Sequence, residues 1–394
     1  MRFLSTERHP DVGRVREAWA RFVGGDDLHG GVHDGANDVV RPYVLRAWER
    51  SRDSGCDAYQ GRAHLLTALG TRRLLDEQAP LVMLGEPFLA ALSRAAGTDR
   101  HAAMLADANG RLLRVVGDAE TIGDENFPRP GALLSESTSG ANGVGTALAE
   151  DGYVELVGPE HYIEGFHAFT CQGVPLRAPG GAITGIVSMS VRRLETADRV
   201  RDILFCATEA AECELLARWL AAGTRDPDEP VLEHLRQDMV QRIAMARLQL
   251  EVAARRIASG ADASATLDAA AQLTRKFVRQ ADLWRRLAVD PVSAPHPERL
   301  RLDDLVADFV DLLSTEVRVA GITLRFGRID PVWVLADPRH AARRLLNGFL
   351  SALQVSVVGT VLTVHVVRDG TVAELRLEPA VDAAAPAARF PVAV

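Results

Sequence analysis

The sequence predicts an α+β protein with antiparallel sheets, divided into two or three domains. Its 394 residues exceed what one compact core usually holds, since domains average about 150 residues. Short β-like runs alternate with turn signals in the first half, and amphipathic helical patterns flank them. Two stretches rich in Pro, Gly and Asp, 221–230 and 288–300, interrupt the periodic pattern. We therefore expect the domain boundaries to lie there.

The β-like runs of the first half indicate an antiparallel sheet. They lie at 101–117, 152–158 and 173–191. The dipeptide Asn109-Gly110 within the first run is a strong hairpin signal. Helical patterns at 71–96 and 197–222 flank the sheet, so this region is predicted to be α+β.

The region between the two boundaries predicts a pair of long helices. Apolar residues recur close to helical spacing at Leu232, Leu235, Met239, Ile243, Leu250 and Ile257, and again at Leu267, Leu273, Phe277, Trp284 and Leu287. The short connection Ser259–Ser264 makes the two helices antiparallel neighbours. A monomer cannot cover both apolar stripes alone, so we expect a homodimer that closes a four-helix bundle.

The last hundred residues predict a second α+β module. A helical pattern at 300–321 precedes a strand pair, and a second helical pattern follows at 337–356. Residues 361–379 read as a β-hairpin that turns at Asp369-Gly370. This module is expected to be a small α/β sandwich.

Composition excludes several classes of protein. No run of about 18 apolar residues could cross a bilayer, and the N-terminus lacks the pattern of a secretion signal. A cytoplasmic protein without a membrane partner is expected. The net charge of -8 does not favour direct binding to nucleic acid, although arginine is dense at 41–52 and 236–256. The four cysteines form no C-x-x-C pair, which predicts reduced thiols instead of a zinc site or disulfides.

The stretch SGANGVGTAL, Ser139–Leu148, has three glycines in six residues, Gly140, Gly143 and Gly145. A Walker loop needs G-x-x-x-x-G-K-[ST], and a dinucleotide loop needs G-x-G-x-x-G after a buried strand. The spacing here is G-x-x-G-x-G without a following lysine. A phosphate site is not predicted.

Ordered motifs from 39 to 220 resemble the GAF-type sensory domain of bacterial enhancer-dependent activators of the acetoin-catabolism-regulator kind. The segment 41–57 resembles that family's "SWxRS…G" helix, although Ala47 replaces its serine. Residues 139–151 resemble "GTNAIGTAL", with Ala141 in place of threonine, and 159–190 resemble "EHF…W.CSAAPIHDPxGxLxGVLDLS". The resemblance implies that the glycine loop borders a small-molecule cavity, where glycine lets the backbone approach a ligand closely.

The resemblance also implies a set of ligand-binding residues. They are Asn142, Gly143, Gly145, Thr146, His161, Tyr162, Phe166, His167, Phe169, Thr170 and Cys171. A small neutral ketone, alcohol or phenol is expected, because no Lys or Arg lies between 135 and 170. A metal or haem site at His161 and His167 is disfavoured, because their spacing of six fits no usual ligand pattern. Cys171 as a nucleophile would need a neighbour that stabilises a thiolate.

The second half resembles a sensor histidine kinase without its chemistry. QDMVQRIA, 237–244, resembles the phosphoacceptor box with Gln237 at the histidine position, while an alternative alignment places Arg236 there. His234 lies nearly one turn earlier. The segment 333–354 resembles the nucleotide-binding helix of the kinase family, and Asn347 matches it, but Ser351 stands where the magnesium-binding asparagine belongs. The segment 374–394 lacks the family's glycine-rich lid, which would bind the phosphates.

The expectations combine into a four-part chain without catalytic residues, metal or cofactor. Its parts are an N-terminal segment 1–38, a GAF-like ligand-sensing domain 39–222, a helical dimerisation hairpin 223–292 and a degenerate kinase ATPase-like domain 293–394. The predicted function is a non-catalytic, histidine-kinase-like scaffold that passes ligand binding to a downstream regulatory protein. Two alternatives remain: an active kinase that uses His234, and a transcription regulator of small-molecule catabolism.

Overall fold

The computed structural model describes residues 10–25, 39–179, 181–192, 194, 198–223, 230–288, 296–379 and 387–393. The chain splits into two compact units. Unit 1 comprises Met1–Leu216 and Ile243–Thr274, and unit 2 comprises Ala217–Arg242 and Arg275–Val394. The four-part division expected from the sequence stays a prediction. The predicted hairpin region, 223–292, is divided between the two units and does not form a unit of its own.

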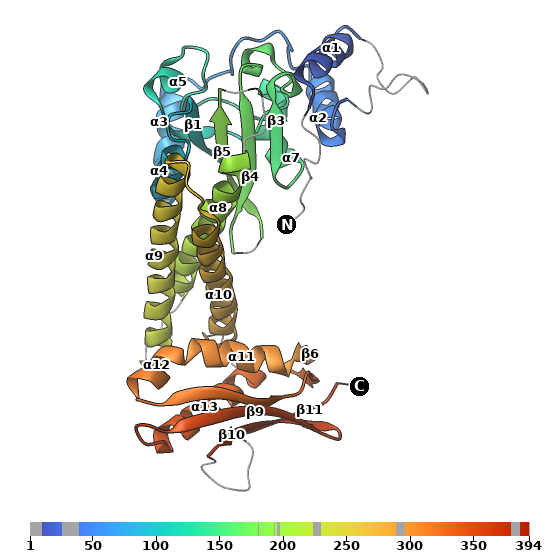
Figure 1. Ribbon diagram of the computed structural model, residues 1–394. Coiled ribbons are helices and arrows are strands. Elements are labelled where there is room, and N and C mark those ends of the chain that lie inside the picture. The colour runs from blue at the N-terminus through green and yellow to red at the C-terminus, as the bar shows by residue number, and fades with distance from the viewer. Residues whose placement is uncertain are drawn as a thin grey trace. The chain divides into compact units, whose positions relative to one another are not determined.

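Unit 1 is built on a five-stranded antiparallel sheet in the order β2-β1-β5-β4-β3 (Figure 1). Its strands are β1 (His101–Asp107), β2 (Leu112–Gly117), β3 (Val154–Val157), β4 (Thr170–Arg177) and β5 (Ile183–Val191). The predicted turn at Asn109-Gly110 joins β1 to β2, with Gly110 at a φ of 72°. The antiparallel sheet with flanking helices is therefore confirmed.

Both faces of this sheet are covered. The helices of unit 1 before the hairpin are α1 (Val12–Val23), α2 (Pro42–Asp53), α3 (Ala68–Glu77), α4 (Ala79–Ala95), α5 (Ala119–Gly123), α6 (Glu136–Ser139), α7 (Gly145–Ala149) and α8 (Asp198–Gly223), with 3-10 turns η2 (Gly158–Glu160) and η3 (Glu164–Phe166). Alternate residues of β1 enter different cores: Met104 packs with residues of α1 and α2, whereas Leu105 packs with α4 and α8. Burial on both sides explains why β1 is apolar at nearly every position.

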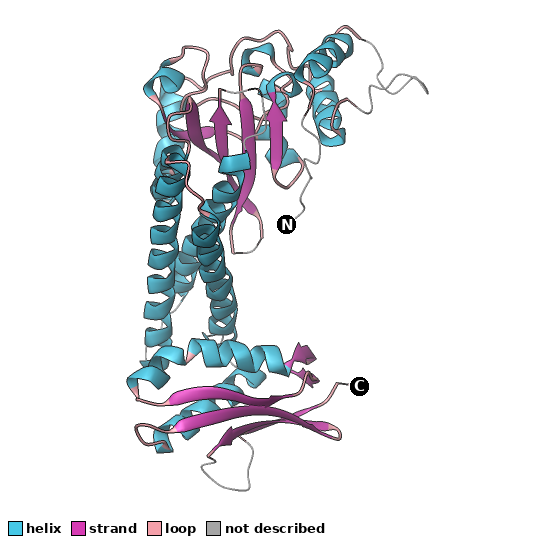
Figure 2. Ribbon diagram, viewed as in Figure 1, coloured by secondary structure: helices cyan, strands magenta, loops and turns pink. Residues whose placement is uncertain are grey.

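The long hairpin consists of α9 (Pro230–Ala258) and α10 (Ser264–Ala288) (Figure 2). Within unit 1 it packs on the helical layer that covers one face of the sheet: Leu250 and Ala270 share one apolar core with Leu92 of α4 and Ala207 of α8. The expectation that only a second copy could cover the apolar stripes is therefore wrong for this part of the hairpin. The residues of α9 left exposed include Met245, Leu248 and Val252. The homodimer itself stays a prediction.

Unit 2 contains a four-stranded sheet, order β11-β10-β9-β7, and a two-stranded sheet, β6-β8. The elements are β6 (Glu298–Arg301), α11 (Leu302–Leu312), α12 (Ser314–Val319), β7 (Thr323–Ile329), β8 (Trp333–Ala336), α13 (Pro338–Val355), β9 (Val361–Asp369), β10 (Val372–Glu378) and β11 (Ala388–Pro391). The expected hairpin forms and turns at Asp369-Gly370. The expected strand pair does not form, because β7 pairs with β9 in parallel and β8 pairs with β6.

Helices α11 and α13 supply the apolar layer of unit 2. Phe309 and Phe349 stack with ring centroids 6.3 Å apart. The side chain of Asp337 starts α13 by accepting hydrogen bonds from the backbone N–H groups of Arg339 (2.9 Å) and His340 (3.2 Å). The general expectation of an α/β sandwich holds.

Candidate functional site

A cavity lies between the sheet of unit 1 and the glycine loop. It is partly open to solvent, and its walls surround about 310 Å³ of space free of protein atoms, a volume that includes open solvent. Strands β1, β4 and β5, the glycine loop and three connecting segments supply its walls. The lining residues are Met104, Phe127, Pro128, Leu134, Asn142, Gly143, Val144, Phe166, Phe169, Cys171, Ser188 and Ser190. No charged side chain is among them, so the cavity suits a small neutral molecule.

The cavity is lined by five of the eleven residues expected to contact a ligand. Those that line it are Asn142, Gly143, Phe166, Phe169 and Cys171. Those that do not line it are Gly145, Thr146, His161, Tyr162, His167 and Thr170. Sequence reasoning missed Ser188 and Ser190, although two serines two residues apart in an apolar strand share one face and could have been noticed. Ligand contact by any of these residues stays a prediction.

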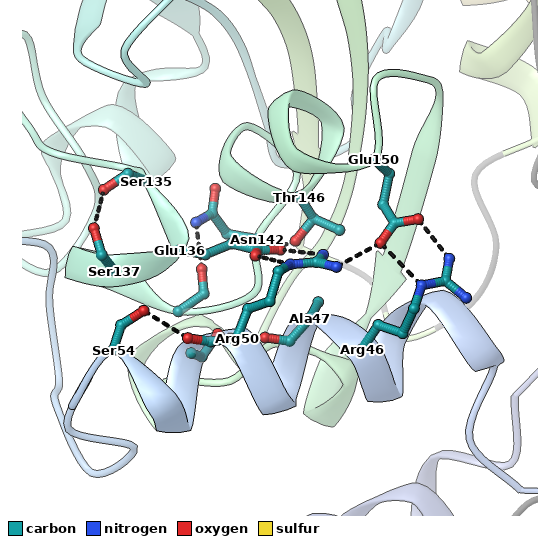
Figure 3. A network of polar contacts seen from close by, with 12 residues as sticks. Arg46, Ala47, Arg50, Ser54, Ser135, Glu136, Ser137, Asn142, Thr146 and Glu150 are labelled. Carbon is teal, nitrogen blue, oxygen red and sulfur yellow. Dashed lines mark hydrogen bonds and ion pairs between the residues drawn. The ribbon is translucent and has the colours of Figure 1, made fainter.

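Asn142 is the centre of the glycine loop rather than a free polar group (Figure 3). Its Nδ2 donates to the carbonyl oxygens of Leu134 (2.8 Å) and Gly140 (2.7 Å). Its Oδ1 accepts from the backbone N–H groups of Val144 (3.0 Å) and Gly145 (3.0 Å). These four bonds use both donors and both acceptor positions of the amide. Asn142 therefore shapes the cavity wall and has no hydrogen bond left for a ligand.

Close packing explains the three glycines of the loop. Gly140 adopts a φ of 59°, and a Cβ there would lie 2.5 Å from Tyr162 Cβ. A Cβ on Gly145 would lie 2.4 Å from the carbonyl oxygen of Leu134, and one on Gly143 would lie 2.9 Å from Cys171 Cβ. Gly143 and Gly145 have no positive φ, so space and not backbone strain requires glycine there.

Arg50 of α2 joins both flanks of the glycine loop. Its guanidinium bonds the Glu136 carboxylate on α6 through Nε (2.5 Å) and Nη2 (3.0 Å), and that of Glu150 after α7 through Nη1 (2.8 Å). Arg46 adds a second ion pair to Glu150 (Figure 3). Burial raises the pKa of the Glu150 carboxyl, but the bonds from Arg46 and Arg50 outweigh burial and lower it overall. The loop is thus held by charge-assisted bonds at both ends.

The two histidines stabilise the turn that precedes β4. His161 Nδ1 lies 2.9 Å from the Gly158 carbonyl oxygen, which can only accept, so Nδ1 carries the hydrogen. Burial lowers the pKa of His161 to about 3, so the ring is neutral. His167 Nε2 lies 3.1 Å from the His161 carbonyl oxygen, and its ring packs edge-on against Trp19. Among the described residues no three His, Cys, Asp or Glu side chains cluster as metal ligands would.

Cys171 is a buried thiol. Its Sγ lies 3.0 Å from Ser190 Oγ, and burial raises its pKa to about 12. The group therefore stays protonated near neutral pH, which does not fit a nucleophilic thiolate. Its neutral thiol instead supplies a weakly polar atom to the cavity.

The kinase-like features lie in unit 2. Gln237 on α9 and both Asn347 and Ser351 on α13 are exposed. The side chains of His234 and Arg236 fall outside the described residues, as do residues 380–386 of the segment 374–394, where the family has its lid. None of the described helices is long and apolar enough to span a bilayer.

Residues 28–215 match the family model described as MimR, N-terminal domain. The chain is 27% identical over 350 residues to the propane 2-monooxygenase operon transcriptional activator MimR of Mycolicibacterium smegmatis, covering 79% of this chain and 57% of that protein. It is 26% identical over 209 residues to the acetoin dehydrogenase operon transcriptional activator AcoR of Bacillus subtilis, covering 51% of this chain and 33% of that protein. The resemblance of the N-terminal half to transcriptional activators is therefore confirmed, although the chain spans less than two thirds of either relative's length.

A solved structure, the Escherichia coli DhaR(N)-DhaL complex, is 17% identical with a TM-score of 0.44 and covers 51% of this chain and 67% of that one.

Proposed function

We propose that the protein is a small-molecule-responsive regulator of transcription whose unit 1 is the sensor. The observation that carries this proposal is the apolar cavity under the glycine loop, which lies in the segment matching the MimR N-terminal domain. The relatives named as transcriptional activators favour this role over the kinase-like scaffold expected from the sequence.

The expected ligand is a small neutral organic molecule. The cavity walls are mainly apolar, with Phe127 and Phe169 in an edge-on contact at 5.4 Å between ring centroids. The names of the two relatives refer to propane and acetoin, which are both small and uncharged. A charged ligand would lose its hydration without gaining an opposite charge among the lining residues.

The proposed output is a change in packing between the sensor and the hairpin. The sheet that forms one cavity wall packs, on its other face, against α4 and α8. Helix α9 attaches to the same layer through the Arg94–Glu251 ion pair and through Arg247, which lies 3.7 Å from Glu214. A ligand that binds one arrangement of the sheet more tightly would shift this helical layer and so reach α9. A homodimer formed through α9 would carry the change to a downstream regulatory protein.

A second candidate is the non-catalytic histidine-kinase-like scaffold. The two alignments place Gln237 or Arg236 at the phosphoacceptor position, and this favours the scaffold over an active kinase, because neither an amide nor a guanidinium accepts a phosphoryl group as imidazole does. Incubation with radiolabelled ATP tests the active-kinase alternative. Phosphate incorporation that His234→Ala abolishes would establish the kinase and refute both non-catalytic roles.

The sensor role is tested by a thermal-shift screen of the full chain against small alcohols, ketones and phenols. A compound that raises the melting temperature is then given to cells with and without the gene, and transcript levels are compared. A gene-dependent response to that compound supports the regulator. A bound compound that changes no transcript would leave a sensor but refute control of transcription.

A further inference from the structure

The cavity wall formed by β5 carries two serines, Ser188 and Ser190. They lie two residues apart on one strand and so face the same side. Both are buried, with 0% and 1% of their surface exposed, and both line the cavity. Cys171 on β4 is the cross-strand partner of Ser190. Since the amide of Asn142 is fully used by the loop, these three side chains supply the remaining polar side-chain atoms of the wall.

Ser188 offers only an acceptor to the cavity. Its Oγ donates its single hydrogen to the carbonyl oxygen of Gln172 at 2.7 Å. A hydroxyl has one hydrogen and two lone pairs, so the Oγ of Ser188 keeps acceptor capacity alone.

The pair Ser190 and Cys171 offers one donor. Their side chains each carry one hydrogen, and the contact of 3.0 Å between Oγ and Sγ uses one of the two, whichever atom donates. The other hydrogen remains for an oxygen in the cavity. An acceptor and a donor therefore stand side by side on a wall that is otherwise apolar.

We propose that Ser188, Ser190 and Cys171 bind the hydroxyl group of a small neutral alcohol. The ligand hydroxyl donates to Ser188 Oγ and accepts from the Ser190–Cys171 pair, while its carbon skeleton contacts the apolar walls. A ketone of the same shape has no hydrogen for Ser188, and a hydrocarbon can make neither bond. This assignment rests on the proposed sensor function and narrows its ligand to alcohols.

The test compares three ligands with one skeleton, cyclopentanol, cyclopentanone and cyclopentane, in NMR titrations of the full chain. The expected Kd of cyclopentanol is about tenfold lower than that of cyclopentanone, which lacks one net hydrogen bond, and about 100-fold lower than that of cyclopentane, which lacks both. Ser188→Ala and Ser190→Ala should each raise the Kd of cyclopentanol towards that of cyclopentane without changing the latter. Ser51→Ala removes an equally buried hydroxyl far in sequence from the wall, one that bonds the Ala47 carbonyl oxygen, and should leave all three values unchanged.

Three results would overturn the assignment: no binding of cyclopentanol, equal binding of the three compounds, or serine variants that weaken all three alike. Ser188→Ala also leaves the Gln172 carbonyl without its donor, so if that variant fails to fold, Ser190→Ala decides. Binding of cyclopentanone without preference for cyclopentanol would refute hydroxyl recognition and leave the sensor function standing. Failure of the sensor function would instead appear as no stabilisation by any compound of the wider screen.

Discussion

Replacing Asn142 with alanine should destabilise unit 1 strongly. The side chain is 4% exposed, and its loss leaves the N–H groups of Val144 and Gly145 and the carbonyls of Leu134 and Gly140 without the hydrogen bonds that the amide makes to them. An unsatisfied buried polar group costs about 1 to 3 kcal/mol, and water entering the space left by the amide recovers part of that. We therefore expect the free energy of unfolding to fall by about 3 to 5 kcal/mol.

Urea unfolding of the full chain, followed by tryptophan fluorescence, measures this loss. Trp19 and Trp48 report on unit 1, where both are buried. Hydrogen exchange read by mass spectrometry adds local detail, because the amides of Val144 and Gly145 lose their acceptor. Each should exchange about 10- to 100-fold faster, since 1.4 kcal/mol corresponds to a factor of ten.

Asn126→Ala is the matched control, because Asn126 is exposed and its removal should change stability by no more than about 0.5 kcal/mol. A loss below about 1 kcal/mol in Asn142→Ala, with unchanged exchange in the loop, would refute the structural role. If that variant also lost ligand affinity while remaining as stable as the wild type, Asn142 would be a ligand contact after all.

Three further predictions concern other parts of the chain. Arg50→Met should lower the free energy of unfolding by about 2 kcal/mol in urea titrations, because it leaves the mostly buried carboxylate of Glu136 without its cation. An unchanged free energy of unfolding would contradict the stabilising role of the Arg50 ion pairs. Burial raises the pKa of the Glu212 carboxyl to about 7, so the stability that its protonated form contributes is complete below about pH 4.5 and is lost as the pH rises through 7. Relative to Glu212→Gln, the wild type should therefore lose up to about 3 kcal/mol of its free energy of unfolding between pH 5 and pH 8. Parallel pH profiles of stability in the two proteins would refute this. Leu248 is 55% exposed, so Leu248→Asp should dissociate the expected homodimer without unfolding the chain, as light scattering at micromolar concentration would show. Ile243→Asp should instead unfold the chain, because Ile243 is buried. A wild-type protein that is already monomeric at this concentration would exclude the dimer.

Local sequence signals predicted much of the fold. The turns at Asn109-Gly110 and Asp369-Gly370 fix hairpins through residues that adopt positive φ, so they can be read from the sequence. The parallel pairing of β7 with β9 could not, because it joins strands separated by α13 and depends on tertiary packing. The sequence showed the apolar stripe of α9 but not the surface that covers it. The helical periodicity that includes Leu250 fits packing against α4 and α8 as well as packing against a second copy of the chain.

The candidate site was predicted in outline only. Its glycine loop was found because three glycines in six residues are unusual, and the structure explains them by close packing. The hydrogen bonds of Asn142 could not be predicted, because a sequence does not show that all four hydrogen-bonding positions of an amide are used within its own loop. The spacing of Ser188 and Ser190 indicates that they share one face of a strand, but the sequence does not show that this face meets the cavity.

The most direct test of the sensor is whether a small neutral molecule binds in the cavity under the glycine loop. Ligand-observed NMR of the full chain, with a panel of small alcohols, ketones and phenols, should detect binding that Gly143→Val weakens at least about tenfold, since a Cβ there lies 2.9 Å from Cys171 Cβ and 3.1 Å from Ser188 Oγ. Gly123→Val is the matched control, because a Cβ on Gly123 meets no atom within 4 Å, and it should bind as the wild type does. Binding of no compound, or equal binding by wild type and a folded Gly143→Val, would contradict the account.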